Sequence, residues 1–270
     1  MNLRQFAISA GLVAGSAIAL SAPAQAFSFQ THYSESLTGD QASKGDIFLD
    51  AITLGDGSVI NDFTLVNSAS IVSNDIYTGG NSGAASADIG DLATTGLREE
   101  ALTNAGAKAV MNNLNLNNII DTEDKGNFIL DLNFEQAVDN IFLWERGKNS
   151  RLDIQALDAN GNEIGNLLEL ASSKTWDNAG FKINTKEIGR AQKVGSIGIS
   201  MADFGLTSGY ISGVRVSSKG REYNGPDFKL LGSVANVTPE EVPEPSALLG
   251  LGAIVAGLAA SGRRKKEQLA

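Results

Sequence analysis

Short segments in which apolar and polar residues alternate recur along most of the chain. The clearest is Gly126–Phe134, where Phe128, Leu130, Leu132 and Phe134 are separated by less apolar residues. Successive side chains of a β-strand point to opposite faces of a sheet, so a period of two predicts a strand buried on one face. The next segment, AVDNIFLWE, is predicted to form a further strand.

The sequence RLDIQALDANGNEIGNLLEL predicts a β-hairpin. Leu152 and Ile154 share one face, and the residues around Asn160-Gly161 then turn the chain, because both tolerate a positive φ. An EF-hand-like count is the alternative, with oxygen ligands at Asp158, Asn160, Asn162 and Glu169. Glu163 stands where that loop needs glycine, so the hairpin is favoured.

Further short apolar segments are separated by turns rich in Gly, Asp, Asn and Ser. One region differs: residues 97–116, LREEALTNAGAKAVMNNLNL, have apolar residues near helical spacing and then an Asn-rich turn. Many short strands with small-residue turns are typical of two-sheet folds. We therefore expect a mainly β protein, an antiparallel β-sandwich or jelly-roll-like ectodomain with one inserted helix.

The first 26 residues have the organisation of a signal peptide. Arg4 supplies a positive start, the 15 residues Phe6–Leu20 are apolar, and Ala24 and Ala26 form an A-x-A cleavage site. We expect export by the Sec machinery and a mature chain that begins at Phe27.

The C-terminal segment predicts a membrane anchor. Residues 247–262 are uncharged and apolar, close to the shortest length that spans a bilayer as a helix. The basic residues after them hold residues 263–270 on the cytoplasmic side. The prolines before them exclude a helix and leave residues 242–246 extended. The sorting residues are Pro243, Glu244, Pro245 and Ser246, and the basic cluster is Arg263, Arg264, Lys265 and Lys266.

This order of Pro-Glu-Pro, short apolar helix and basic tail resembles the PEP-CTERM sorting signal. The resemblance implies cleavage near Pro-Glu-Pro by an exosortase, a membrane cysteine transpeptidase. The chain would be anchored transiently in the inner membrane and then reach the cell surface or extracellular matrix. The motif residues would be substrate and not catalyst.

Composition narrows the function of the remaining residues, 27–241. They hold 16 cations and 29 anions, a net charge of −13, which disfavours nucleic acid and anionic lipid as partners. The chain has no cysteine and a single histidine, His32, so thiolate and His-rich metal sites are excluded. A cysteine nucleophile is excluded as well, and a Ser-His-Asp triad would have to use His32.

Two stretches could bind ligands. In LWERGKNS, Trp144 could stack on a sugar ring while Glu145, Arg146 and Asn149 bind its hydroxyl groups. The alternative is a core tryptophan that ends a strand, with Glu145 and Arg146 paired; Trp176 presents the same choice. Calcium is the one cofactor we consider, in the acidic segment DTED (residues 121–124) or between strand loops, although DTED could equally be a solvated turn.

Four stretches resemble a family of exosortase-dependent surface proteins with a β-rich ectodomain. They are NLNNIIDTED, FLWERGKNS, AQKVGSIGISMADFG and YNGPDFKLLG, within about residues 96–232. The resemblance implies a surface role and supplies no active site.

Three functions remain open. The leading hypothesis is a non-enzymatic protein of a Gram-negative-type cell surface or matrix. The alternative is a carbohydrate-binding module for exopolysaccharide that could require calcium. A calcium-stabilised hydrolase rests only on the abundance of carboxylates.

Overall fold

The structure is a computed structural model that describes residues 26–78, 82–87, 101–171, 174–185 and 190–235. Within these ranges the strands form a ten-stranded sheet and a three-stranded sheet, and all pairings are antiparallel. The elements are β1 (Phe29–Glu35), η1 (Gly39–Lys44), β2 (Ile47–Leu54), β3 (Val59–Ile60), β4 (Val66–Asn74), β5 (Ala84–Ala87), α1 (Asn104–Met111), β6 (Ile119–Thr122), β7 (Asn127–Arg146), β8 (Leu152–Leu157), β9 (Glu163–Leu170), β10 (Asp177–Ile183), β11 (Gln192–Ser200), β12 (Ile211–Lys219) and β13 (Phe228–Val234).

Strand β7 belongs to both layers of a sandwich. It is 20 residues long, well above the usual length of a strand. Residues 128–133 pair with β4 and β12, and β8 and β9 extend that layer beyond β12. Residues 140–145 pair with β11 and β13, beyond which lie β10 on one side and β6 and β5 on the other. The first core lies between these two layers and includes Leu130, Leu143 and Val216.

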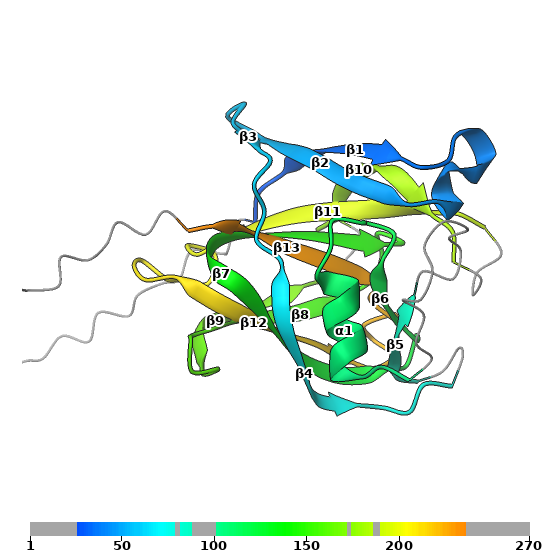
Figure 1. The fold of residues 1–270 in the computed structure, drawn as a ribbon. Helices are drawn as coiled ribbons and strands as arrows, with labels where there is room; N and C mark the ends of the chain where they lie inside the picture. Colours follow the sequence, from blue (N-terminus) through cyan, green and yellow to red (C-terminus); the bar gives the residue numbers. More distant parts are fainter. Residues whose placement is uncertain (1–25, 79–81, 88–100, 172–173, 186–189, 236–270) are drawn as a thin grey trace, which may run out of the picture. The chain divides into compact units, whose positions relative to one another are not determined.

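The three-stranded sheet of β1, β2 and β3 forms a third layer against the second half of β7 (Figure 1). Between them lies the second core, which contains Phe29, Ile52, Phe142 and Trp144. Edge-on contacts join the rings of Phe29 and Phe142, with centroids 5.3 Å apart, and those of Phe29 and Trp144, 5.4 Å apart. The layer formed by the second half of β7, β11 and β13 is therefore covered on both faces. Within it, the run IFLWER is buried without alternation.

Helix α1 lies along strand β4 and occupies its free edge (Figure 1). Thr103 caps the helix by accepting a hydrogen bond from the N–H of Gly106 at 3.0 Å. Asn104 accepts a hydrogen bond from the N–H of Ile71 at 2.8 Å, and Asn112 donates one to the carbonyl of Val66 at 2.7 Å. These side chains replace the partners that an edge strand would seek in another molecule.

The asparagine-rich turn after α1 connects the helix to the third layer. Asn115 accepts a hydrogen bond from the N–H of Ile47 at 3.0 Å, and Asn117 donates one to the carbonyl of Gly45 at 2.7 Å. Both asparagines are buried, so these bonds satisfy backbone groups that water cannot reach.

The fold class predicted from the sequence is confirmed: the protein is mainly β and antiparallel, with α1 inserted between β5 and β6. Among the described residues, no helix is long and apolar enough to cross a membrane. The chain divides into two compact units, Met1–Ala235 and Asn236–Ala270. The second unit and the signal peptide up to residue 25 lie outside the described residues, so the predicted processing segments remain predictions.

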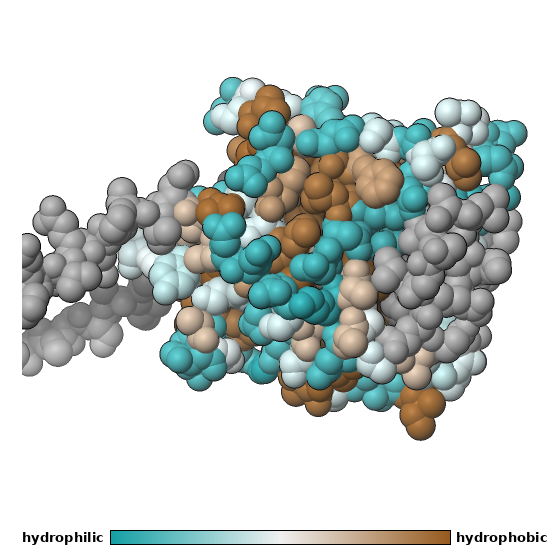
Figure 2. Space-filling view, viewed as in Figure 1, coloured by the Kyte–Doolittle hydropathy of each residue, from teal (hydrophilic) through white to brown (hydrophobic). Residues whose placement is uncertain are grey.

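Apolar side chains on the surface are dispersed. The most exposed large ones come from separate elements and loops, and the face in Figure 2 shows apolar groups interrupted by hydrophilic ones.

Candidate functional site

A polar pocket of about 140 Å³ lies where β6, β7 and β11 meet the loop before β13. Its lining is almost entirely polar, with amide, hydroxyl, carboxylate and guanidinium groups. It draws residues from each of the stretches NLNNIIDTED, FLWERGKNS, AQKVGSIGISMADFG and YNGPDFKLLG. The lining residues are Thr122, Asp124, Arg146, Asn149, Ser150, Gln192, Asn224, Gly225 and Asp227.

Arg146 forms the charged wall of this pocket. It is 3% exposed, and its Nη2 lies 2.5 Å from Oδ2 of Asp227 and 3.5 Å from Oδ1 of Asp121. Asp227 also accepts a hydrogen bond from the N–H of Thr122 at 2.8 Å. A buried arginine held by two carboxylates keeps its charge and position, so it presents a fixed donor to the pocket.

Two turns with unusual backbone conformations form the rim. Gly147 and Lys148 have φ values of 115° and 60°, and Asn224 and Gly225 have values of 56° and 50°. A Cβ on Gly225 would lie 2.3 Å from the carbonyl oxygen of Thr122, so only glycine allows this close approach to β6.

Ser150 joins these two turns. Its hydroxyl lies 2.8 Å from the carbonyl oxygen of Asn224 and 3.3 Å from that of Gly225, so it can donate to either. The carbonyl of Ser150 accepts a hydrogen bond from the indole N–H of Trp176 at 3.0 Å. Trp176 is 2% exposed, so the rim is fixed to the first core.

Glu145 is fully buried next to the pocket-lining Arg146. Burial raises the pKa of its carboxyl to about 7, although Ser150, the backbone of Lys148 and Asn149, and Arg146 act in the opposite direction. Neither carboxylate oxygen completes a hydrogen bond, which is why desolvation prevails. The carboxyl therefore changes its charge near neutral pH.

The four residues predicted in LWERGKNS have different surroundings. Arg146 and Asn149 line the pocket, whereas Glu145 is buried next to Arg146. Trp144 is 1% exposed, lies against Phe29 and donates from Nε1 to the hydroxyl of Thr31 at 3.1 Å. The stacking role predicted for Trp144 is wrong, because its ring faces are covered in the second core.

The pairing predicted for Glu145 and Arg146 takes a different form. Arg146 is paired instead with Asp227 and Asp121, because neighbours along a strand point to opposite faces. Asp121 begins the DTED segment, in which Asp121 and Glu123 are buried, and Asp124 lines the pocket. The interpretation of DTED as a solvated turn is therefore wrong.

The pocket also contains residues that the sequence did not single out as ligand-binding. Gln192, Asn224 and Asp227 lie in the stretches AQKVGSIGISMADFG and YNGPDFKLLG, but no spacing pattern linked them to Arg146. The Asn224-Gly225 turn was the only local signal.

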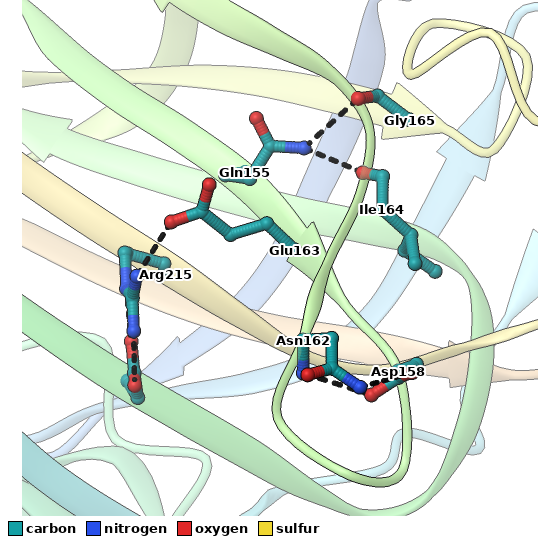
Figure 3. Close-up of polar contacts among 8 residues, drawn as sticks. Gln155, Asp158, Asn162, Glu163, Ile164, Gly165 and Arg215 are labelled. Carbon is teal, nitrogen blue, oxygen red and sulfur yellow. Dashed lines mark hydrogen bonds and ion pairs between the residues drawn. The ribbon is translucent and has the colours of Figure 1, made fainter.

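The turn between β8 and β9 is the predicted hairpin (Figure 3). Oδ1 of Asp158 accepts hydrogen bonds from the N–H groups of Asn160 and Asn162, both at 2.8 Å, and Gly161 has a φ of 79°. Asn162 thus points at Asp158 within the turn, and the hairpin is confirmed over the EF-hand-like alternative. Among the described residues, no group of three His or acidic side chains could hold a metal ion.

Beside this turn, Arg215 of β12 lies on the outer face of its layer. Its Nε and Nη2 contact the two carboxylate oxygens of Asp131 at 2.7 and 2.8 Å, and its Nη1 contacts Glu163 at 2.5 Å (Figure 3). Gln155 donates to the carbonyl of Ile164 at 2.5 Å. These bonds connect β7, β12, β8 and β9, so we assign them a structural role.

A second cleft of about 310 Å³ lies between η1, the end of β1 and β10. Its lining is dominated by small side chains and backbone, with Glu35, Asp40 and Lys182 as the charged members. His32 lies nearby in sequence on the exposed side of β1, where its Nε2 is 2.8 Å from the hydroxyl of Thr53. The cleft lacks the convergent, fixed polar groups of the Arg146 pocket.

Comparison with known proteins identifies no family for this chain. No family model and no curated protein matches the chain. Among solved structures, the chain is similar to the lectin domain of lectinolysin, solved in complex with Lewis B antigen. The identity is 14%, the match covers 43% of this chain and 72% of that one, and the TM-score is 0.26. A likeness at this level supports no inference about the ligand of this chain.

Proposed function

We propose that the chain is an exported, non-enzymatic protein of the cell surface or extracellular matrix. The Sec machinery exports it, and residues 247–262 anchor it transiently in the inner membrane. An exosortase then cleaves near Pro243-Glu244-Pro245. The product is the β-rich module, delivered without its basic tail.

The position of Phe27 carries the export part of this proposal. Phe27 follows the predicted cleavage site, and its N–H donates to the carbonyl of Gly198 at 2.9 Å. Its ring also lies edge-on to Phe142, with centroids 6.1 Å apart. Cleavage after Ala26 would convert that N–H into an ammonium group, which still donates. Phe27, the first residue after the predicted cleavage site, is therefore held in the fold by backbone and ring contacts.

The test uses the full-length chain in its native cells, with mass spectrometry of the terminal peptides in each cell fraction. The wild type should be found at the surface, with its N-terminus at Phe27 and without RRKKEQLA. Replacing Pro243, Glu244 and Pro245 with alanine should leave the tail attached and the protein in the inner membrane. Pro239→Ala is the matched control, which should be sorted normally. Equal sorting of all three proteins would contradict the proposal.

The Arg146 pocket supports a second candidate function, binding of a polar saccharide unit of an exopolysaccharide. Fixed amide, guanidinium and carboxylate groups match the alternating donors and acceptors of sugar hydroxyls. None of the described residues that line the pocket is aromatic, so hydrogen bonds would provide the recognition. The side chain of Asn149 is exposed and can adapt to a ligand. Arg146 is held in place by its ion pair with Asp227 and offers a rigid contact.

A glycan array with the exported protein, with and without calcium, tests this second function. Binding should weaken in Asn149→Ala and Gln192→Ala, because each loses an amide at the pocket. Gln41→Ala removes an exposed amide on η1 and should bind like the wild type. Absence of binding to every glycan, including the polysaccharide of the native cells, would reject the saccharide site and leave the sorting proposal standing.

A further inference from the structure

A fully buried lysine meets a partly buried asparagine at the C-terminal end of α1. Lys229 of β13 is 0% exposed, and its Nζ lies 3.1 Å from Oδ1 of Asn113 and also contacts the carbonyl oxygen of Val110. We propose that Lys229 and Asn113 join covalently, as an amide bond between Nζ of the lysine and Cγ of the asparagine. This inference is independent of the export and saccharide proposals.

The amide of Asn113 is held in place and polarised. Its Nδ2 donates to the carbonyls of Ala109 and Val110 at 2.8 and 3.1 Å. Its Oδ1 accepts a hydrogen bond from the N–H of Asn115 at 2.9 Å, in addition to the contact with Lys229. A backbone N–H directed at this oxygen would stabilise the negative charge that develops on it when a nucleophile adds to Cγ.

The surroundings of Lys229 favour the nucleophilic form of its amine. Burial lowers the pKa of Lys229 well below its ordinary value, which raises the share of the neutral, nucleophilic amine. Lys219 provides a contrast within the same chain. Its Nζ lies 2.6 Å from Asp153, its side chain is 59% exposed, and its hydrogen bond to Asp153 raises its pKa. Lys219 therefore stays an ammonium and does not react.

The reaction is a transamidation that needs no other reactant. Nζ of Lys229 forms a bond to Cγ of Asn113, and the Cγ–Nδ2 bond breaks. A proton passes from Nζ to Nδ2, which leaves as ammonia. Both nitrogens contact the carbonyl oxygen of Val110, so they are neighbours before the reaction. No electron is gained or lost, and the chain becomes lighter by one ammonia.

The cross-link would connect parts of the module that are far apart in the sequence. Lys229 and Asn113 are 116 residues apart, and the bond would tie the last strand to the end of α1. A covalent link between distant residues restricts the unfolded chain. The chain has no cysteine, so disulfides cannot provide this restriction.

The experiment is a tryptic digest of the denatured full-length protein after it has folded in cells. An unlinked chain yields the peptides Ala109–Lys125 and Glu222–Lys229. In a linked chain trypsin does not cut after Lys229, because that lysine is acylated, so the second peptide runs from Glu222 to Arg263 or to the processed C-terminus. The product is Ala109–Lys125 joined to this longer peptide, lighter by one ammonia than the sum of the two. Cleavage after Lys219 should be complete and serves as the internal control.

Two variants identify the residues that form the bond. Asn113→Ala and Lys229→Met should each abolish the joined peptide, and Asn113→Ala should restore cleavage after Lys229. A wild-type protein that gives both linear peptides with complete cleavage after Lys229 would overturn the proposal. Lys229 would then act only as a donor to the last carbonyls of α1. The wild-type digest decides between these outcomes even where a variant fails to fold.

Discussion

Phe27 and Gly198 exchange two backbone hydrogen bonds, of 2.9 and 2.8 Å, and the ring of Phe27 covers the Cα of the glycine. A Cβ at Gly198 would lie 2.2 Å from Cε2 of Phe27. The glycine thus allows the first residue of the predicted mature chain to lie on β11 and contact Phe142.

Gly198→Ala should move the Phe27 ring away from Phe142. Overpacking of this kind costs about 1–3 kcal/mol of the free energy of unfolding. Urea denaturation monitored by tryptophan fluorescence would measure the loss. Gly55→Ala is the matched control, because a Cβ there meets nothing within 4 Å. Equal stability of the two variants would show that the packing of the Phe27 ring does not require glycine at position 198.

Arg146→Met should be among the most destabilising single changes. It leaves Asp227 and Asp121 buried without the guanidinium between them, which typically costs about 3–5 kcal/mol. Arg215→Met is the comparison, since that side chain is 29% exposed and water can compensate its partners. We expect a loss of about 1 kcal/mol there. Guanidinium denaturation of both variants gives the two values, and a larger loss for Arg215 would contradict this ranking.

The sequence pattern predicted those elements whose surroundings are simple. The first half of β7 has one buried face, so Phe128, Leu130 and Leu132 alternate with less buried neighbours. The β8–β9 turn needs only local hydrogen bonds from Asp158 and the positive φ of Gly161. Both depend on residues close in the sequence, which is why they could be predicted.

The pattern did not predict which strand would lie in the middle of three layers. Trp144, Glu145 and Arg146 end an apolar run with two charges, which left open a core tryptophan with Glu145 and Arg146 paired or a sugar-binding site. The third layer covers Trp144, and Asp121 and Asp227 neutralise Arg146. These partners come from β6 and the loop before β13, so no spacing within one segment could have indicated the pocket.

The asparagines of α1 should protect β4 from pairing with another molecule. Asn104→Ala removes the acceptor for the N–H of Ile71, and Asn112→Leu removes the donor to Val66. Each lost bond costs about 1 kcal/mol, and the freed edge can pair with a second chain. We expect faster hydrogen exchange at the amide of Ile71 in Asn104→Ala, and self-association of the double variant in light scattering. Unchanged exchange at Ile71 would show that the helix does not protect this edge.

Glu145 should make the stability of the module depend on pH near neutrality. Its pKa rises from 4.5 to about 7 on folding, so the folded state binds the proton more tightly than the unfolded state. The resulting stabilisation is complete below pH 4.5 and is lost as the pH rises through 7.

Glu145→Gln is a neutral replacement that removes this dependence. From pH 4.5 to pH 8, the free energy of unfolding of the wild type should fall by about 3 kcal/mol relative to that of the variant, because one pKa unit corresponds to about 1.4 kcal/mol. Urea unfolding of both proteins across this range measures the difference at each pH. A difference that does not change with pH would mean that the carboxyl is not titrating near 7. It would also mean that the backbone of Lys148 and Asn149 stabilises the carboxylate more than its burial disfavours it.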